Sequence, residues 1–243
     1  HGDVAISDGT IAEIGLLRDA EADRVIDAAG KVLCPGFVDG HSHSDLFVLA
    51  KPESPMKILQ GCTTENVGLD GMSVAPISDD DKEAWKTHLS GLAGKHAVDW
   101  TWNSVGQYLD TVDAVRPAVN ISTYAGLGTI RRKVMGMEVG EPSDSQLEAM
   151  KDLVRESMEQ GARGLSAGLI YPPSQFQSLE EMTELCKVAA EYDGVYDVHM
   201  RNESDTMDQA IDEVVELARR SGIRLMITHF KVRGQKNWGR STE

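Results

Sequence analysis

Two histidines one residue apart, His41 and His43, follow the strand-like run of residues 36–40. Side chains at positions i and i+2 of a β-strand leave the same face, so both imidazoles are expected to point together from the end of this strand. Neutral imidazole is a good zinc ligand. A pair alone is also an ordinary polar strand end, so it predicts a metal site only where further ligands join it.

Two more histidines close strand-like runs. His199 follows residues 194–198, and His229 follows residues 223–228. Each run comes after a helical segment, and the C-terminal end of such a strand is where barrel enzymes collect their catalytic groups. Four histidines at strand ends therefore indicate a site for a divalent metal ion.

The composition excludes several classes of protein. The 243 residues are 41% hydrophobic and 26% charged, as in a soluble globular protein. A formal net charge of −15 argues against binding to nucleic acid or to an anionic membrane, and no apolar run approaches the roughly 18 residues of a membrane span. Cys34, Cys62 and Cys186 are an odd number without a Cys-x-x-Cys pair, which predicts reduced thiols in a cytoplasmic protein. The oligomeric state is not indicated.

The N-terminal residues 1–33 are predicted to be β-structure. The runs 4–6 and 11–14 flank Ser7-Asp8-Gly9-Thr10, a hairpin turn signal. Two further short strands are expected at 24–26 and 31–33, split by a turn at 27–30.

After Pro35 the pattern changes to strands that alternate with amphipathic helices. Helices are expected from the cap at Ser143 to Met158, and over 179–191 and 208–220, with strands between them. This alternation predicts a parallel sheet or barrel. Strands that start near residues 36, 62, 117, 162, 195 and 223 make six βα units, whereas a closed barrel has eight. We therefore expect the rest of the barrel to lie beyond this chain.

Five sequence blocks, taken together, resemble the amidohydrolase superfamily and, within it, the N-acyl-D-amino-acid deacylases, or D-aminoacylases. The blocks are residues 35–45, 60–76, 161–173, 199–203 and 229–231. The resemblance implies an α/β fold, a (β/α)8 TIM-type barrel that is incomplete in this chain. Residues 1–33 would form part of a small β-sandwich domain, and residues 34–243 would form the first six βα units.

The resemblance also implies a reaction, namely zinc-dependent hydrolysis of the amide bond of N-acyl-D-amino acids to a carboxylate and a D-amino acid. The expected partner is a small-molecule N-acyl amino acid, and the expected cofactor is one or two Zn²⁺ ions or another divalent metal. The catalytic aspartate of the family follows strand eight, which lies beyond this chain. No catalytic residue is assigned here, and we expect little turnover from residues 1–243 alone.

Several residues occupy positions to which the family gives a role. By that resemblance, His41 and His43 would be the metal ligands from strand one, and His199 and His229 those from strands five and six. Tyr171 matches a position that helps to hold the substrate carboxylate, although a loop tyrosine packed beside prolines is an equal alternative. Lys231 is a candidate partner for an anionic group of the substrate, although a solvated lysine is commoner.

One departure from the family concerns the metal site. Asp70 stands where many members have a cysteine, and it is either a metal ligand or simply a turn residue before Gly71. A carboxylate is a harder donor than a thiolate and would discriminate less against manganese. Residues 162–169 contain no lysine, so the bridging carboxylated lysine of hydantoinases and dihydroorotases has no candidate there. This favours the deacylases.

Two alternatives remain open. The first is another amidohydrolase, either dihydroorotase-like or hydantoinase-like, or dipeptidase-like. The second is a non-catalytic scaffold with the same fold, because a fold does not guarantee a function. The four intact histidines count against the scaffold.

Overall fold

The computed structural model describes residues 2–242. They divide into two compact units at the bond between Pro35 and Gly36. Each unit is described by itself.

The N-terminal unit contains an antiparallel hairpin of β1 (Asp3–Ser7) and β2 (Thr10–Gly15). Ser7 pairs with Thr10, so Asp8 and Gly9 form a two-residue turn with φ angles of 52° and 75°. Positive φ at both central residues is what a type I′ hairpin turn requires, and Asp-Gly is a favoured sequence for it. The predicted hairpin is confirmed.

The two further strands expected in this unit are wrong. Residues 24–26 and 31–33 are exposed and belong to no strand, although the Lys31 amide donates to the Ala28 carbonyl in a turn between them. A strand requires a neighbour to accept and donate its backbone hydrogen bonds, and neither run has one among the described residues. That residues 1–33 contribute to a β-sandwich stays a prediction.

The second unit is an α/β structure in which every strand pairing is parallel. The orders are β3-β4-β5 and β6-β7-β8-β9. Only Tyr124 separates β5 from β6, and its amide donates to the Val67 carbonyl. The strands are β3 (Phe37–Asp39), β4 (Cys62–Val67), β5 (Asn120–Thr123), β6 (Ala125–Gly126), β7 (Gly164–Gly168), β8 (Val195–His199) and β9 (Arg224–Ile227).

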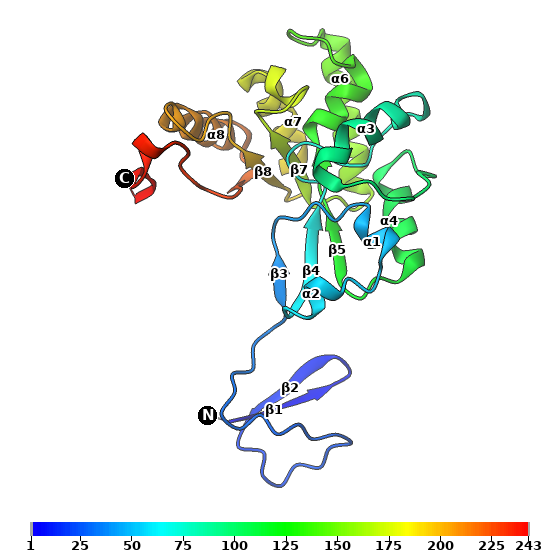
Figure 1. Ribbon diagram of the computed structural model, residues 1–243, viewed down its shortest axis with the longest axis vertical. Helices are drawn as coiled ribbons and strands as arrows, with labels where there is room; N and C mark the ends of the chain where they lie inside the picture. Colours follow the sequence, from blue (N-terminus) through cyan, green and yellow to red (C-terminus); the bar gives the residue numbers. More distant parts are fainter. Residues whose placement is uncertain (1, 243) are drawn as a thin grey trace. The chain divides into compact units, whose positions relative to one another are not determined.

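In this unit helices connect successive strands, except between β5 and β6 (Figure 1). The three helices expected from the sequence are present as α6, α7 and α8, and the predicted α/β class with parallel sheets is confirmed. The closed barrel stays a prediction. The helices are α1 (Phe47–Ala50), α2 (Pro55–Ile58), α3 (Lys82–Ala93), α4 (Val105–Val115), α5 (Leu127–Met135), α6 (Asp144–Glu159), α7 (Leu179–Ala190) and α8 (Met207–Ser221); short 3₁₀ turns span Asp79–Asp81, Ser174–Phe176, Gln235–Asn237 and Arg240–Thr242.

The core of this unit lies between the parallel strands and their helices. All five residues of β7 are buried, α5 and α7 pack against it, and α6, α7 and α8 pack successively on one another. Ser143 begins α6 with a capping box, in which its hydroxyl accepts from the Gln146 amide and the Gln146 side chain accepts from the Ser143 amide. The packed core therefore holds the ends of the strands in place.

Over residues 2–242, no helix has both the length and the apolar character that crossing a bilayer requires. The three cysteines are all free. The cytoplasmic location predicted from them stays a prediction.

Candidate metal centre

His41 and His43 lie just beyond the C-terminal end of β3. The His41 amide donates to the Asp39 carboxylate over 3.2 Å, which fixes the chain as it leaves the strand. The two rings meet edge to face, with centroids 4.8 Å apart. The two imidazoles come together as predicted, but they lie in the loop after β3, which ends at Asp39, and not in the strand itself.

Asp70 lies in a tight turn after β4. Both Asp70 and Gly71 have positive φ, 54° and 72°. The Ser166 hydroxyl of β7 holds the turn, because it donates to the Gly68 carbonyl over 2.6 Å and accepts from the Gly71 amide over 3.0 Å. A non-glycine residue in this left-handed conformation is uncommon and needs such support from its surroundings. The turn directs a buried carboxylate toward the ends of the strands.

His199 and His229 come from the neighbouring strands of the other sheet. His199 is the last residue of β8, and His229 follows β9 by two residues with φ of 35°. Their ring centroids are 4.5 Å apart, and that of His229 is 5.2 Å from that of His41. All four predicted histidines therefore gather at one place.

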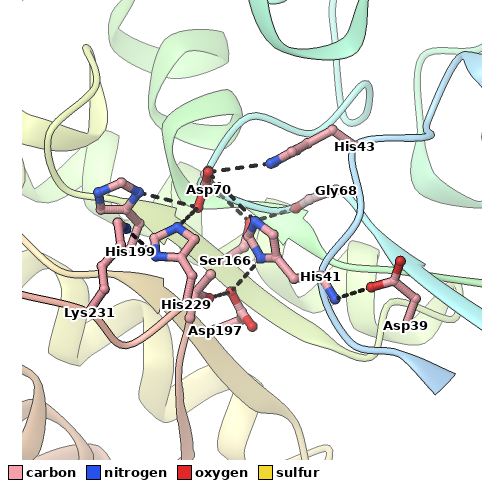
Figure 2. Close-up of polar contacts among 12 residues, drawn as sticks. Asp39, His41, His43, Gly68, Asp70, Ser166, Asp197, His199, His229 and Lys231 are labelled. Atoms are coloured by element: carbon pink, nitrogen blue, oxygen red, sulfur yellow. Dashed lines mark hydrogen bonds and ion pairs between the residues drawn. The ribbon is translucent and has the colours of Figure 1, made fainter. Parts of the chain in front are cut away.

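Asp70 lies between the two histidine pairs (Figure 2). Its Oδ2 is 3.8 Å from His41 Nε2 and 3.5 Å from His43 Nε2. Its Oδ1 is 3.8 Å from His199 Nδ1 and 3.9 Å from His229 Nε2. Each oxygen faces one pair, so the five residues form two potential ligand groups that share Asp70. Asp70 is thus both a turn residue and the centre of the cluster.

The donor atoms fit a zinc ion. Neutral imidazole and carboxylate are zinc ligands, and with bonds of about 2.0–2.2 Å the donors around one tetrahedral ion lie roughly 3.4 Å apart. The distances to Asp70 fall close to this spacing and are too long for good hydrogen bonds. Among the described residues, Asp70 Oδ1 and both ring nitrogens of His199 are buried without a hydrogen-bond partner. Such atoms are costly to bury unless something else binds them.

The protonation states also suit a cation. Burial lowers the pKa of His41 to about 4, so the ring is neutral at pH 7. Burial alone would raise the pKa of Asp70, but the His199, His43 and His41 rings outweigh it and hold the pKa well below its usual range. Neutral imidazole and ionised carboxylate are the forms that bind metals.

Two buried carboxylates stand behind the histidines. Glu203 Oε2 is 3.6 Å from His199 Nε2, and its Oε1 is 3.1 Å from His229 Nδ1. Asp197 of β8 lies 4.0 Å from His41 Nδ1, and burial raises its pKa to about 7 although the Thr228 hydroxyl donates to it. We did not predict Asp197 from the sequence. The signal was available, because a residue two positions before His199 in a strand must share its face.

The two predicted substrate-binding residues also lie near the cluster. The Tyr171 ring is edge to face with His199, with centroids 5.4 Å apart. Lys231 Nζ donates to Glu203 Oε1 over 2.6 Å and lies 3.0 Å from His229 Nδ1. Arg201, in contrast, pairs with Glu213 of α8 over 2.9 Å and so links the loop after β8 to this helix. The roles of Tyr171 and Lys231 in binding substrate stay predictions.

Parallel strands with a histidine and carboxylate cluster at their C-terminal ends are an arrangement that suits a metal-dependent enzyme. The model of one amidohydrolase family matches residues 24–240, and the chain belongs to this amidohydrolase family. The resemblance predicted from the sequence is confirmed.

Three relatives make the similarity more specific. D-aminoacylase of Alcaligenes xylosoxydans xylosoxydans is 35% identical, over 100% of this chain and 49% of that protein. The structure of N-acyl-D-glutamate deacylase from Bordetella bronchiseptica, complexed with zinc and a phosphonate that mimics the tetrahedral intermediate, matches with a TM-score of 0.90 and 34% identity, covering 99% of this chain and 50% of that one. A D-aminoacylase structure concerned with its binuclear metal centre matches with a TM-score of 0.84 and 34% identity, covering 99% and 48%. The chain spans about half the length of the curated relatives it matches.

Proposed function

We propose that the protein is a zinc-dependent deacylase that hydrolyses the amide bond of N-acyl-D-amino acids. The observation that carries the proposal is the position of Asp70, one oxygen toward His41 and His43 and the other toward His199 and His229. The similarity to D-aminoacylase and to N-acyl-D-glutamate deacylase supports this substrate class.

The proposal includes a fold larger than this chain. Residues 34–243 would be the first six βα units of a (β/α)8 barrel, and residues 1–33 part of a small β-sandwich. The parallel order of the strands and the exposed apolar residues of β3, Phe37 and Val38, support such an arrangement, because further strands would cover them.

In this proposal each residue of the site has a defined role. His41, His43, Asp70, His199 and His229 hold one or two zinc ions. The bound metal supplies a Lewis acid that acidifies water and polarises an amide carbonyl. Glu203 holds Lys231 beside the cluster, where its ammonium group, together with Tyr171, would orient the substrate carboxylate. Transfer of a proton to the leaving amine is not assigned to any residue of this chain.

Asp70 also bears on the choice of metal. Its carboxylate is a harder donor than a thiolate, and oxygen donors suit manganese as well as zinc. We expect the site to accept Mn²⁺ more readily than a thiolate-containing site would.

Elemental analysis of the full-length protein, purified without added metal, tests the metal site. We expect one or two zinc ions per chain, and their loss in the His199→Ala, His229→Ala double variant. The matched control is His88→Ala, because His88 stacks on Trp85 of α3 and belongs to neither ligand group. A wild-type protein that also fails to take up added zinc would contradict the proposal.

Turnover of a substrate panel tests the reaction. We expect the zinc-loaded full-length protein to hydrolyse N-acetyl-D-amino acids and to spare their L-enantiomers. Hydantoin and dihydroorotate belong in the same panel. Turnover of the cyclic amides alone would replace the deacylase with a hydantoinase-like enzyme.

A further inference from the structure

Asp197 is a buried carboxylate without an obvious structural partner for one of its oxygens. It lies in the middle of β8, its side chain has 0% exposure, and its two neighbours in the strand, Tyr196 and Val198, are apolar or aromatic. The Thr228 hydroxyl donates to Oδ1, whereas Oδ2 has no hydrogen-bond partner among the described residues. Burying such a group is costly unless a donor is present. We therefore expect a functional reason for a carboxylate at this position.

His41 lies beside this carboxylate, on the side of Oδ1 rather than of the unpartnered Oδ2. Its Nε2 faces Asp70 at 3.8 Å, and its Nδ1 faces Asp197 Oδ1 at 4.0 Å (Figure 2). His41 Nδ1 is itself buried and has no hydrogen-bond partner in the described part of the chain. A shift of about 1 Å would bring the two atoms to hydrogen-bond distance.

We propose that Asp197 is a positioning residue that accepts the Nδ1–H of His41 and thereby presents Nε2 to the metal. The inference rests on the proposed function, in which His41 is a ligand. A neutral imidazole that gives one nitrogen to a metal carries its proton on the other, and a carboxylate that accepts this proton fixes the tautomer and the orientation of the ring.

The opposite side of the cluster has the same arrangement. His199 and His229 each turn one nitrogen toward Asp70 and the other toward Glu203. Asp197 thus does for His41 what Glu203 does for the other pair. Because Asp197 belongs to β8 and His41 follows β3, the contact also joins residues of the two sheets across the site.

The variant Asp197→Asn of the full-length protein tests the proposal. Asparagine keeps the shape and can still accept from Thr228, but its neutral amide is a weaker acceptor than a carboxylate for the His41 Nδ1–H. We expect the zinc affinity of the group His41, His43 and Asp70 to fall 10- to 100-fold, while the group Asp70, His199 and His229 keeps its affinity. Titration of the metal-free protein with zinc in the presence of a competing chelator measures both.

The protonation of His41 provides a second readout that general loss of structure would not imitate. In ¹⁵N NMR spectra of the zinc-loaded wild type we expect the His41 proton on Nδ1, and in Asp197→Asn we expect this signal to shift or to exchange with solvent. Tyr196→Phe is the matched control, because it alters the adjacent residue on the other face of β8. It should leave both zinc affinities and the His41 signal unchanged.

A second variant keeps the test decisive if Asp197→Asn does not fold. Thr228→Val removes the hydroxyl that holds Asp197 but leaves the carboxylate, and we expect it to weaken zinc at the same group less than 10-fold. Unchanged zinc affinity and an unchanged His41 signal in a folded Asp197→Asn protein would overturn the inference, as would an equal loss at both groups. Zinc binding by the wild type without deacylase turnover would overturn only the proposed function.

Discussion

The two sheets of residues 36–243 differ in how well they are covered, yet both contribute to one site. In the first sheet, Phe37 and Val38 of β3 are 57% and 62% exposed. In the second, every residue of β7 is buried, and so are the last four residues of β8. The first sheet leads to His41, His43 and Asp70, and the second provides His199 and leads to His229.

The difference teaches that the site depends on the ends of the strands more than on their whole length. In β4 the first residues are partly or fully exposed, whereas Val67 at its C-terminal end is buried. Asp70 follows from that buried end and is held by Ser166 of the second sheet. An open edge at the start of a strand is therefore compatible with a well-formed cluster at its end.

The largest effect is expected at the residue that both sheets share. Asp70→Ala removes the one carboxylate common to both ligand groups, so we expect zinc to be lost from both. Asp70→Cys restores a zinc ligand of another type and should bind zinc. Elemental analysis of the dialysed full-length proteins measures the outcome, and zinc retained at wild-type stoichiometry in Asp70→Ala would show that the two sheets bind metal independently.

A second large effect concerns the helices that cover the second sheet. Arg131 of α5 and Glu181 of α7 form an ion pair with both side chains fully buried. Arg131→Met leaves the buried Glu181 without its cation, although the Gln177 amide still donates to it, and we expect this to cost about 3–5 kcal/mol of unfolding free energy. Urea denaturation of the metal-free protein measures the loss.

Lys57→Met is the matched variant beside the first sheet. Lys57 is itself 17% exposed and pairs with Asp39, which is 29% exposed and can turn to water, and with the buried Glu65. The Ser42 hydroxyl still donates to Glu65, so we expect a smaller loss than in Arg131→Met. Equal losses would mean that the two sheets are braced to the same degree, contrary to the comparison.

The last comparison concerns the strands themselves. Leu165→Ala in β7 removes a fully buried side chain and should cost about 2–5 kcal/mol. Val38→Ala in the exposed β3 should change the unfolding free energy of the 243-residue chain by about 0.5 kcal/mol or less. Both values come from urea denaturation at equal pH, and a cost for Val38→Ala that matches that of Leu165→Ala would show that β3 is covered in solution.

Much of this arrangement is predictable from the sequence, because it follows from local rules. The strand-like run before His41 and the helical period around Met150 and Val154 indicate the elements without reference to distant residues. The expected gathering of four strand-end histidines follows from the parallel order of the strands.

The rest depends on partners that a single sequence does not identify. The run 31–33 has the apolar pattern of a strand, but a strand forms only where a neighbouring strand supplies partners for its backbone hydrogen bonds. From the sequence, Asp70 could equally be a turn residue or a metal ligand. The structure adds that four histidine rings surround its carboxylate. In the sequence, Asp197 is one polar residue in an apolar run. Only the structure shows that it lies beside His41.

The shared carboxylate has one more consequence. Because each oxygen of Asp70 faces a different histidine pair, two bound cations would draw on the same negative charge and repel each other across it. Binding at one group would then weaken binding at the other, and linkage would require the two penalties to be equal whichever ion bound first. A single aspartate would thus make zinc uptake anticooperative, with half-occupancy stable over a wide range of metal concentration.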